Sequence, residues 1–306
     1  MVLDLNNKDK KFENFKSGFV AIAGAPNVGK STLLNRMLCE KISITSQKPQ
    51  TTRNRILGVV HRQTSQLVFL DTPGMHRAKS KLNERIVDVA VSTLSDVDII
   101  LFVVNPYAPD PELQDFLVRQ VSKQKKPVLL AVNKIDIVKK PLLLAVMDTW
   151  KEAYEFQSII PVSAKTGTQV DNLLTTMESL LPLSPPLYPK ETLTDLSERF
   201  IAAEMIREKV FRLTGQEIPY STAVTIDTYS ENSKRSFVKI SASINVERDS
   251  QKGIIIGKNG SKLKKIGQDA RKEIERMLNA KVYLKLFVRV QKNWSSDTKA
   301  LRQFGY

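Results

Sequence analysis

Cysteine and histidine are nearly absent from this sequence, which holds one cysteine, Cys39, and two histidines among 306 residues. A single cysteine cannot form an internal disulfide, and no second cysteine stands at a metal-ligand spacing from it. Long apolar runs are missing too, because runs such as Ile99–Val104 are far shorter than the roughly 18 residues that cross a bilayer. The opening residues, MVLDLNNKDKK, lack the apolar stretch of a secretory signal. We therefore expect a cytoplasmic protein whose core forms without disulfide or metal staples.

Acidic residues are scarce relative to basic ones. The chain carries 32 acidic and 47 basic residues, a formal charge of +15. The stretch from Lys252 to Lys292 alone holds 12 basic and 3 acidic residues. A local excess of this size favours a polyanionic partner, either nucleic acid or an anionic membrane surface.

The length and the 42% apolar content suit two domains, each with its own core. Residues 181–189 contain four prolines, which neither a helix nor an inner strand tolerates. We interpret this stretch as a linker. The predicted organisation is an N-terminal tail over 1–16, a first domain over 17–181, a linker over 182–190, a second domain over 191–292 and a C-terminal tail over 293–306.

Short apolar runs alternate with helical patterns in the first domain. The predicted strands are Phe19–Ala23, Leu67–Leu70, Ile99–Val104, Val128–Val132 and Ile159–Val162, and Arg55–His61 is expected to form a hairpin with the second. Strands this apolar are buried on both faces. The pattern predicts an α/β domain with a mostly parallel sheet and helices on both faces.

The second domain changes period. A helix is predicted over 195–214, started by Asp195, and two half-buried strands follow around Val224–Ile226 and Val238–Val246. Gly253–Ile256 is interpreted as a β-like isoleucine run. A helix around Leu263–Met277 and a strand over Val282–Val290 complete a smaller α+β domain in an α-β-β-α-α-β-like order.

A phosphate-binding loop stands between the first strand and a helix. The sequence GAPNVGKS fits G-x-x-x-x-G-K-[ST] in the context that this motif requires. Its glycines let backbone N–H groups surround phosphate oxygens, Lys30 reaches the terminal phosphates and Ser31 ligates Mg²⁺. The predicted phosphate-contacting residues are Gly24, Ala25, Pro26, Asn27, Val28, Gly29, Lys30, Ser31 and Thr32.

Two later motifs indicate guanine rather than adenine. Asn133, Lys134 and Asp136 follow the fourth apolar strand. A carboxylate such as Asp136 pairs with the ring N–H and exocyclic amine of guanine, whereas adenine would leave it unpaired. Ser163, Ala164 and Lys165 follow the fifth strand, where the Ala164 N–H is a weaker candidate contact to the guanine carbonyl.

Asp71, Thr72, Pro73 and Gly74 follow another strand, so Asp71 can hold Mg²⁺ through water and the Gly74 N–H can contact the γ-phosphate. Together the four motifs resemble those of the translation-factor-related class of GTPases. That resemblance implies GTP and GDP as ligands. It also implies a threonine in the loop 49–53, Thr52 in preference to Thr51, that binds Mg²⁺ and the γ-phosphate.

The resemblance makes Lys30, Thr52 and Gly74 the candidate catalytic residues, and Ser31, Thr52 and Asp71 the candidate metal ligands. Met75 stands where small signalling GTPases carry the glutamine that positions water, so slow intrinsic hydrolysis is expected. Members of this class can use K⁺ beside the phosphates, and Asn27 occupies the matching position.

The basic stretch holds Gly257, Lys258, Asn259 and Gly260, which match the Gly-x-x-Gly loop of KH domains. Such a loop clamps about four nucleotides of single-stranded nucleic acid. The candidate RNA-binding residues are Gly253, Ile256, Gly257, Lys258, Asn259, Gly260 and Lys262. For Lys264 and Lys265 two interpretations stay open, contact with RNA or a place on the solvent-exposed face of the helix. Only Tyr283 and Phe287 are aromatic here, so hydrogen bonds and aliphatic packing are expected to read the bases.

The combination of this GTPase pattern, the segment PQTTR at 49–53 and a C-terminal KH domain of type II order resembles the bacterial Era family over nearly the whole chain. The resemblance implies a monomer that binds the 3′ end of 16S ribosomal RNA and acts in maturation of the 30S subunit. Partial association with the inner face of the membrane is implied too. A membrane-associated regulator of growth and a GTPase that supports RNA-modifying enzymes are the alternatives, and no group-transfer site is visible for the latter.

Overall fold

The computed structural model describes residues 13–46, 48, 51–75, 81–107, 111–215 and 218–305. The predicted loop residues Pro49 and Gln50 lie outside this described part. Two compact units are present, and they divide the chain differently from the predicted domains. The first comprises 1–40, 54–77 and 87–195, and the second comprises 41–53, 78–86 and 196–306. Among the described residues no helix is long and apolar enough to span a membrane.

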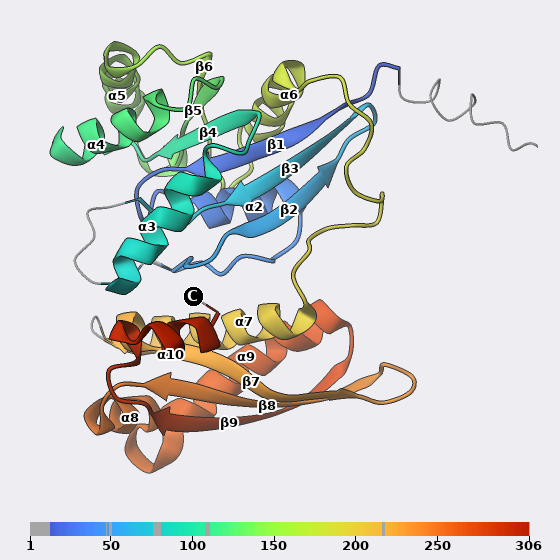
Figure 1. Cartoon of the computed structure of the whole chain (residues 1–306), viewed down its shortest axis with the longest axis vertical. Coiled ribbons are helices and arrows are strands. Elements are labelled where there is room, and N and C mark those ends of the chain that lie inside the picture. The colour runs from blue at the N-terminus through green and yellow to red at the C-terminus, as the bar shows by residue number, and fades with distance from the viewer. Residues whose placement is uncertain are drawn as a thin grey trace, which may run out of the picture. The chain divides into compact units, whose positions relative to one another are not determined.

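A six-stranded sheet forms the centre of the first unit. Its strands are β1 (Lys16–Ala23), β2 (Ile56–His61), β3 (Ser65–Asp71), β4 (Ile99–Val104), β5 (Val128–Val132) and β6 (Ser158–Pro161). They lie in the order β2-β3-β1-β4-β5-β6 (Figure 1). Only β2 pairs antiparallel, through the predicted hairpin with β3. The predicted mostly parallel α/β sheet is confirmed.

Helices cover both faces of this sheet (Figure 1). One face packs against α3 (Lys81–Thr93), α4 (Pro111–Ser122) and α5 (Lys140–Ala153), and the other against α2 (Lys30–Leu38) and α6 (Val170–Leu180). Trp150 of α5 is buried and meets Phe102 of β4 edge-on, with ring centroids 5.4 Å apart. Burial from both sides explains why the strands are apolar at nearly every position.

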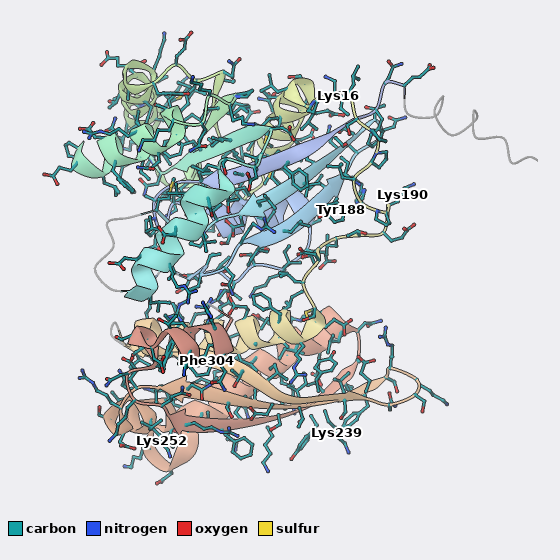
Figure 2. All side chains as sticks on the ribbon, viewed as in Figure 1. Lys16, Tyr188, Lys190, Lys239, Lys252 and Phe304 are labelled. Carbon is teal, nitrogen blue, oxygen red and sulfur yellow. The ribbon has the colours of Figure 1, made fainter. Side chains whose placement is uncertain are left out.

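The proline-rich linker lies along the sheet of the first unit and is held to it by hydrogen bonds. Ser17 N donates to Pro182 O at 3.2 Å, and Gln66 Nε2 donates to Tyr188 O at 2.8 Å. Further along, the N–H of Val59 in β2 donates to Leu193 O at 2.8 Å. This segment, on which Figure 2 labels Tyr188 and Lys190, thus satisfies the backbone N–H of Val59 on the edge strand β2.

A three-stranded sheet forms the second unit, from β7 (Ala223–Glu231), β8 (Phe237–Val246) and β9 (Lys281–Val290) in that order. β7 and β8 are antiparallel, and β8 and β9 are parallel. The helices of this unit are α7 (Glu198–Leu213), α8 (Asp249–Ile256), α9 (Ser261–Leu278) and α10 (Thr298–Gln303). Its short 3₁₀ turns are η3 (Ile218–Ser221), η4 (Lys258–Gly260) and η5 (Trp294–Ser296). A further 3₁₀ turn, η2 (Ile135–Ile137), lies in the first unit. The observed order is α-β-β-α-α-β, and α8 stands where the sequence suggested a β-like run.

Three local predictions were wrong. Helix α7 begins after Ser197, whose hydroxyl accepts from Phe200 N, and not at Asp195. Gly253–Ile256 is the last turn of helix α8 and not a strand, because capping by Gln251 at the start of α8 outweighs the β propensity of three isoleucines. A semi-buried Cys39 at the end of a helix was also expected, but Cys39 is exposed where it caps α2 in a left-handed conformation with φ 56°.

The C-terminal tail packs against its unit. Trp294 is fully buried, its indole N–H donates to Ser221 O at 3.1 Å, and its ring meets Phe304 edge-on. Ala300 and Leu301 of α10 join the same apolar cluster.

A buried carboxylate ties the segment 41–53 to helix α7 inside the second unit. Glu208 has a fully buried side chain, and its oxygens lie 2.6 Å from Lys41 Nζ and 2.9 Å from Lys209 Nζ. The backbone N–H of Thr45 donates to the same carboxylate at 3.0 Å. Burial alone raises the pKa of Glu208, but hydrogen bonds and charges from Lys41 and Lys209 outweigh burial and lower the pKa from 4.5 to about 2.

Replacing this carboxylate should destabilise the second unit. Glu208→Gln leaves two lysines beside a neutral amide, so we expect the free energy of unfolding at pH 7 to fall by about 3 kcal/mol. Because the folded pKa is depressed, the contribution of Glu208 is present above pH 4.5 and is lost as pH falls toward 2. Urea unfolding at several pH values measures both effects.

Asp269→Asn is the matched control, since Asp269 pairs with Lys265 at 3.0 Å on an exposed helix face and such pairs contribute about 0.5 kcal/mol or less. Equal losses in the two variants, or a difference between Glu208→Gln and the parent that does not shrink in acid, would contradict the assigned role of the buried network.

Candidate nucleotide site and nucleic-acid groove

The phosphate loop owes its path to backbone conformations that glycine and asparagine tolerate. Gly24 and Gly29 have φ of 145° and 101°, and Asn27 has φ of 62°. A Cβ on Gly24 would lie 2.2 Å from Val103 O, and one on Gly29 would lie 2.3 Å from Asn133 Nδ2. Both glycines are therefore required by space as well as by φ. Gly29 leads directly into helix α2, whose N-terminal N–H groups favour an anion.

Lys30 and Ser31 open helix α2 on the side of the loop. The Lys30 ammonium donates to Gly24 O at 3.2 Å and to Ala25 O at 2.9 Å. Burial lowers the pKa of Lys30 to about 8, while the negative charge of Asp71 opposes that shift. The cation is thus held within the loop that is to receive phosphate, where it can turn from carbonyl oxygens to phosphate oxygens.

The predicted magnesium ligands of the first unit lie together. The Ser31 hydroxyl donates to Asp71 Oδ2 at 2.7 Å, across 40 residues of chain. Mg²⁺ prefers such oxygen ligands and commonly binds through one or two protein groups plus substrate phosphates. The donor set therefore fits the predicted Mg²⁺, with Ser31 and Asp71 as the groups that would hold it.

The loop after β3 lies against the phosphate loop. Met75 N donates to Gly24 O at 3.1 Å, and the Thr72 hydroxyl donates to Ile22 O at 2.7 Å. A Cβ on Gly74 would lie 2.7 Å from Pro26 Cα, so only glycine permits this approach. Met75 is fully buried in the apolar core of the first unit and cannot position water.

Asn133 connects three of the predicted motifs. Its amide donates to Val28 O of the phosphate loop at 2.9 Å, and its Oδ1 accepts from Ala164 N at 2.9 Å. Lys134 Nζ donates to Asn27 O at 2.6 Å, and burial lowers the pKa of Lys134, with the charge of Asp136 opposing the shift. The Ala164 N–H therefore binds Asn133 in this structure, while a contact to a guanine carbonyl stays a prediction.

Asp136 is oriented by a neighbour from the next loop. The Ser163 hydroxyl donates to Asp136 Oδ1 at 2.7 Å. The pairing of this carboxylate with guanine stays a prediction. Arg36, which sequence reasoning missed, donates through Nε to Ala164 O at 3.0 Å and through its guanidinium to Lys165 O. The sequence contains no motif that predicts this support of the Ser163–Lys165 loop by Arg36, because Arg36 and Ala164 are 128 residues apart.

Thr52 is buried, but it clusters with the second unit. Its predicted roles at Mg²⁺ and the γ-phosphate therefore stay predictions, as do the nucleotide contacts of the remaining loop residues, Thr32, Pro73 and Lys165.

The Gly-x-x-Gly loop in the second unit is a tight connection between α8 and α9. Gly257, Asn259 and Gly260 have φ of 70°, 52° and 74°. A Cβ on Gly257 would lie 2.8 Å from the Cβ of Lys262. Lys258 and Asn259 are exposed at the tip of the loop, so a strand of RNA can approach the backbone closely.

A groove of about 440 Å³ begins at this loop and runs between α9 and β9. Its apolar lining includes Leu263, Leu284 and Leu286, and its cations are Lys264, Arg271 and Lys285. Sequence reasoning missed Arg271 and Lys285 and left Lys264 open, whereas Lys265 is paired with Asp269 outside the groove lining. Aliphatic floor and cationic rim suit single-stranded RNA, as expected.

The buried ammonium makes nucleotide affinity sensitive to pH. Phosphate favours charged Lys30, so binding takes up a proton above the pKa of about 8 in the free protein. We expect GTP affinity to be about tenfold weaker at pH 9 than at pH 7, the loss of protonated Lys30 over that range. Equilibrium titration with a fluorescent GTP analogue measures it. Lys30→Arg keeps its charge throughout, so the same decline in that variant would contradict the assignment.

Comparisons with known proteins agree with these two sites. A family model described as "50S ribosome-binding GTPase" matches residues 19–134, and a "KH domain" model matches residues 217–295. "GTPase Era" of Geotalea uraniireducens is 53% identical over 294 residues, covering 96% of this chain and 99% of that protein. "GTPase Era" of a Geobacter species (strain M21) is 55% identical over 295 residues, with the same coverage.

Solved structures agree as well. A variant of Aquifex aeolicus Era bound to GDP and AlF₄⁻ superposes with a TM-score of 0.91 at 40% identity, covering 95% of this chain and 99% of that one. A structure of Era with MgGDPNP and nucleotides 1506–1542 of 16S ribosomal RNA matches with the same TM-score, identity and coverage. With both of its domains matched and about half of its residues identical to those of the Geotalea and Geobacter proteins, the chain belongs to the Era family of GTPases.

Proposed function

We propose that this GTPase binds the single-stranded 3′ end of 16S ribosomal RNA through its KH domain and acts in 16S rRNA processing and assembly of the 30S subunit. The groove between α9 and β9 carries the proposal, because it joins a Gly-x-x-Gly loop, an apolar floor and three cations. The related Era structure with nucleotides 1506–1542 of 16S ribosomal RNA supports the choice of RNA.

The nucleotide site supplies the switch in this proposal. Lys30 contacts the terminal phosphates, the Gly74 N–H contacts the γ-phosphate, and Ser31 and Asp71 hold Mg²⁺, which would neutralise charge on the phosphates. Thr52 would be a further Mg²⁺ ligand in the GTP state. Because Met75 is buried and apolar, hydrolysis is slow and the GTP state is long-lived.

A monovalent cation is part of the same proposal. Asn27 sits in the phosphate loop with φ 62°, where it can offer an amide oxygen to K⁺. We expect faster GTP hydrolysis in K⁺ than in Na⁺, measured as phosphate release at equal ionic strength. Asn27→Gly keeps the backbone conformation but removes that oxygen, so it should abolish the difference. Equal rates in the two salts for the parent protein would remove the basis for K⁺.

Ultraviolet crosslinking in cells, followed by sequencing of the attached RNA, tests the RNA assignment. We expect reads to concentrate on the 3′ end of 16S rRNA. The Lys258→Ala/Lys262→Ala variant should lose most of them, because both cations lie at the clamp. Lys265→Ala is the matched control, since Lys265 pairs with Asp269 and does not line the groove.

Scattered reads, or reads on transfer RNA, would contradict the proposed role while leaving the GTPase assignment intact. We further propose a monomer in the cytoplasm with peripheral contact to the inner membrane. The charge of +15 supports that contact, and anionic lipid would then compete with RNA for exposed cations.

A further inference from the structure

One face of the sheet in the second unit is turned away from its helices. Alternate residues of β8 and β9, among them Val238, Ile240 and Val282, are buried in the cluster that includes α7 and α9. The residues between them point to the opposite face, because successive side chains of a strand alternate. Figure 1 shows α7 and α9 together beside this sheet, and Figure 2 labels Lys239, an exposed residue of the opposite face.

Cations and aromatic rings alternate along β9 on this opposite face. The residues in order are Lys281, Tyr283, Lys285, Phe287 and Arg289, all exposed. Tyr283 is 58% exposed and Phe287 is 40% exposed. Lys285 Nζ lies 4.9 Å from the centre of the Phe287 ring, a cation–π contact.

Strand β8 adds residues of the same kinds. In the register of the sheet, Lys239 lies opposite Tyr283, and Phe237, 37% exposed, lies opposite Lys281. On β7, Asp227 accepts from Ser243 at 2.7 Å and lies 3.4 Å from Arg289. Because Lys239, Lys281, Lys285 and Arg289 outweigh this one carboxylate, the aromatic-basic face, as we call it, is positively charged.

Three exposed rings among cations differ from scattered surface residues. Single exposed apolar side chains are normal, but rings gathered on one face mark an interaction surface. Sheet faces that bind single-stranded nucleic acid stack bases on aromatic rings and place cations beside the phosphates. Tyr283 and Phe287 are four residues apart, about 13 Å along the strand.

The aromatic-basic face adjoins the groove. Lys285 lines the groove and also belongs to this face, because β9 is the strand at the edge of the sheet. Single-stranded RNA that leaves the groove over this edge reaches Tyr283 and Phe287 directly. A second copy of this chain fits less well, since matching faces would oppose their cations.

We propose that the aromatic-basic face is a second binding surface for single-stranded RNA, which stacks bases on Tyr283 and Phe287 and extends the RNA held by the groove. This inference rests on the proposed RNA-binding function. It predicts that RNA longer than the roughly four nucleotides held by a KH clamp gains affinity from these two rings.

Fluorescence anisotropy with the full-length protein tests this proposal. The probes are labelled RNAs of about 4 and about 16 nucleotides that end at the 3′ terminus of 16S rRNA. The variant Tyr283→Leu/Phe287→Leu should bind the longer RNA at least about tenfold more weakly and the shorter RNA unchanged, because each stacked base contributes roughly five- to 150-fold in affinity.

Two control variants separate stacking from folding. Tyr283→Phe/Phe287→Tyr keeps both rings and should retain the affinity for the longer RNA. Tyr107→Leu removes an equally exposed ring, 55% exposed, from the first unit and should change nothing. Thermal unfolding by circular dichroism checks that the leucine variant is folded.

Unchanged binding of the longer RNA by a folded leucine variant, or equal weakening for both lengths, would overturn this inference. If Lys258→Ala/Lys262→Ala still weakens the shorter RNA, the groove assignment survives that failure. If the parent protein binds neither RNA, the proposed function fails together with the inference. A change of oligomeric state in the leucine variant, seen by sedimentation, would make the face a protein interface and overturn the proposal.

Discussion

Parallel pairing of β1 with β3 and β4, and of β5 with its neighbours, brings the carboxyl ends of these strands to one edge of the sheet, and the nucleotide site depends on this constraint. The phosphate loop follows β1, Asp71 is the last residue of β3, and Asn133 and Ser163 lie in the loops after β5 and β6. The sheet brings these loops near one another, and side chains then set their spacing. One carboxamide, that of Asn133, joins partners that lie 105 and 31 residues away in the sequence. Short motifs are sufficient to form the nucleotide site, because the strands determine where each motif lies.

The same constraint explains which features could be predicted from sequence. Strands buried on both faces leave continuous apolar runs, and half-buried strands leave alternation, so both sheets were recognisable. The errors fall where several local preferences compete. The isoleucines of Gly253–Ile256 favour a strand, yet Gln251 accepts hydrogen bonds from the N–H groups of Glu247 and Arg248 and caps a helix there. Asp195 and Ser197 are both good caps, and in the structure the Ser197 hydroxyl makes the capping hydrogen bond, from Phe200 N.

The supporting residues of both sites could not be predicted, because they depend on how elements distant in sequence face one another. Arg36 acts on a loop that begins after β6, and Arg271 and Lys285 meet only when α9 lies beside β9. Lys264 and Lys265 are neighbours with the same charge, but one lines the groove and the other pairs with Asp269. The rotation of α9 about its axis determines which of the two lysines faces the groove, and this rotation cannot be predicted from composition.

Net charge is therefore a poor measure of the surface available to RNA. Lys209 is buried beside Glu208, Arg207 is buried beside Glu204, and these pairs stabilise the second unit without presenting charge to a ligand. Salt screens such buried pairs only weakly, whereas contacts between exposed cations and phosphates release counterions when RNA binds. The dependence of RNA affinity on salt thus counts the cations of the clamp and the groove rather than the formal charge of +15. The same residue types thus have two roles. Buried lysines and arginines stabilise α7, exposed ones are available to RNA, and only burial distinguishes the two groups.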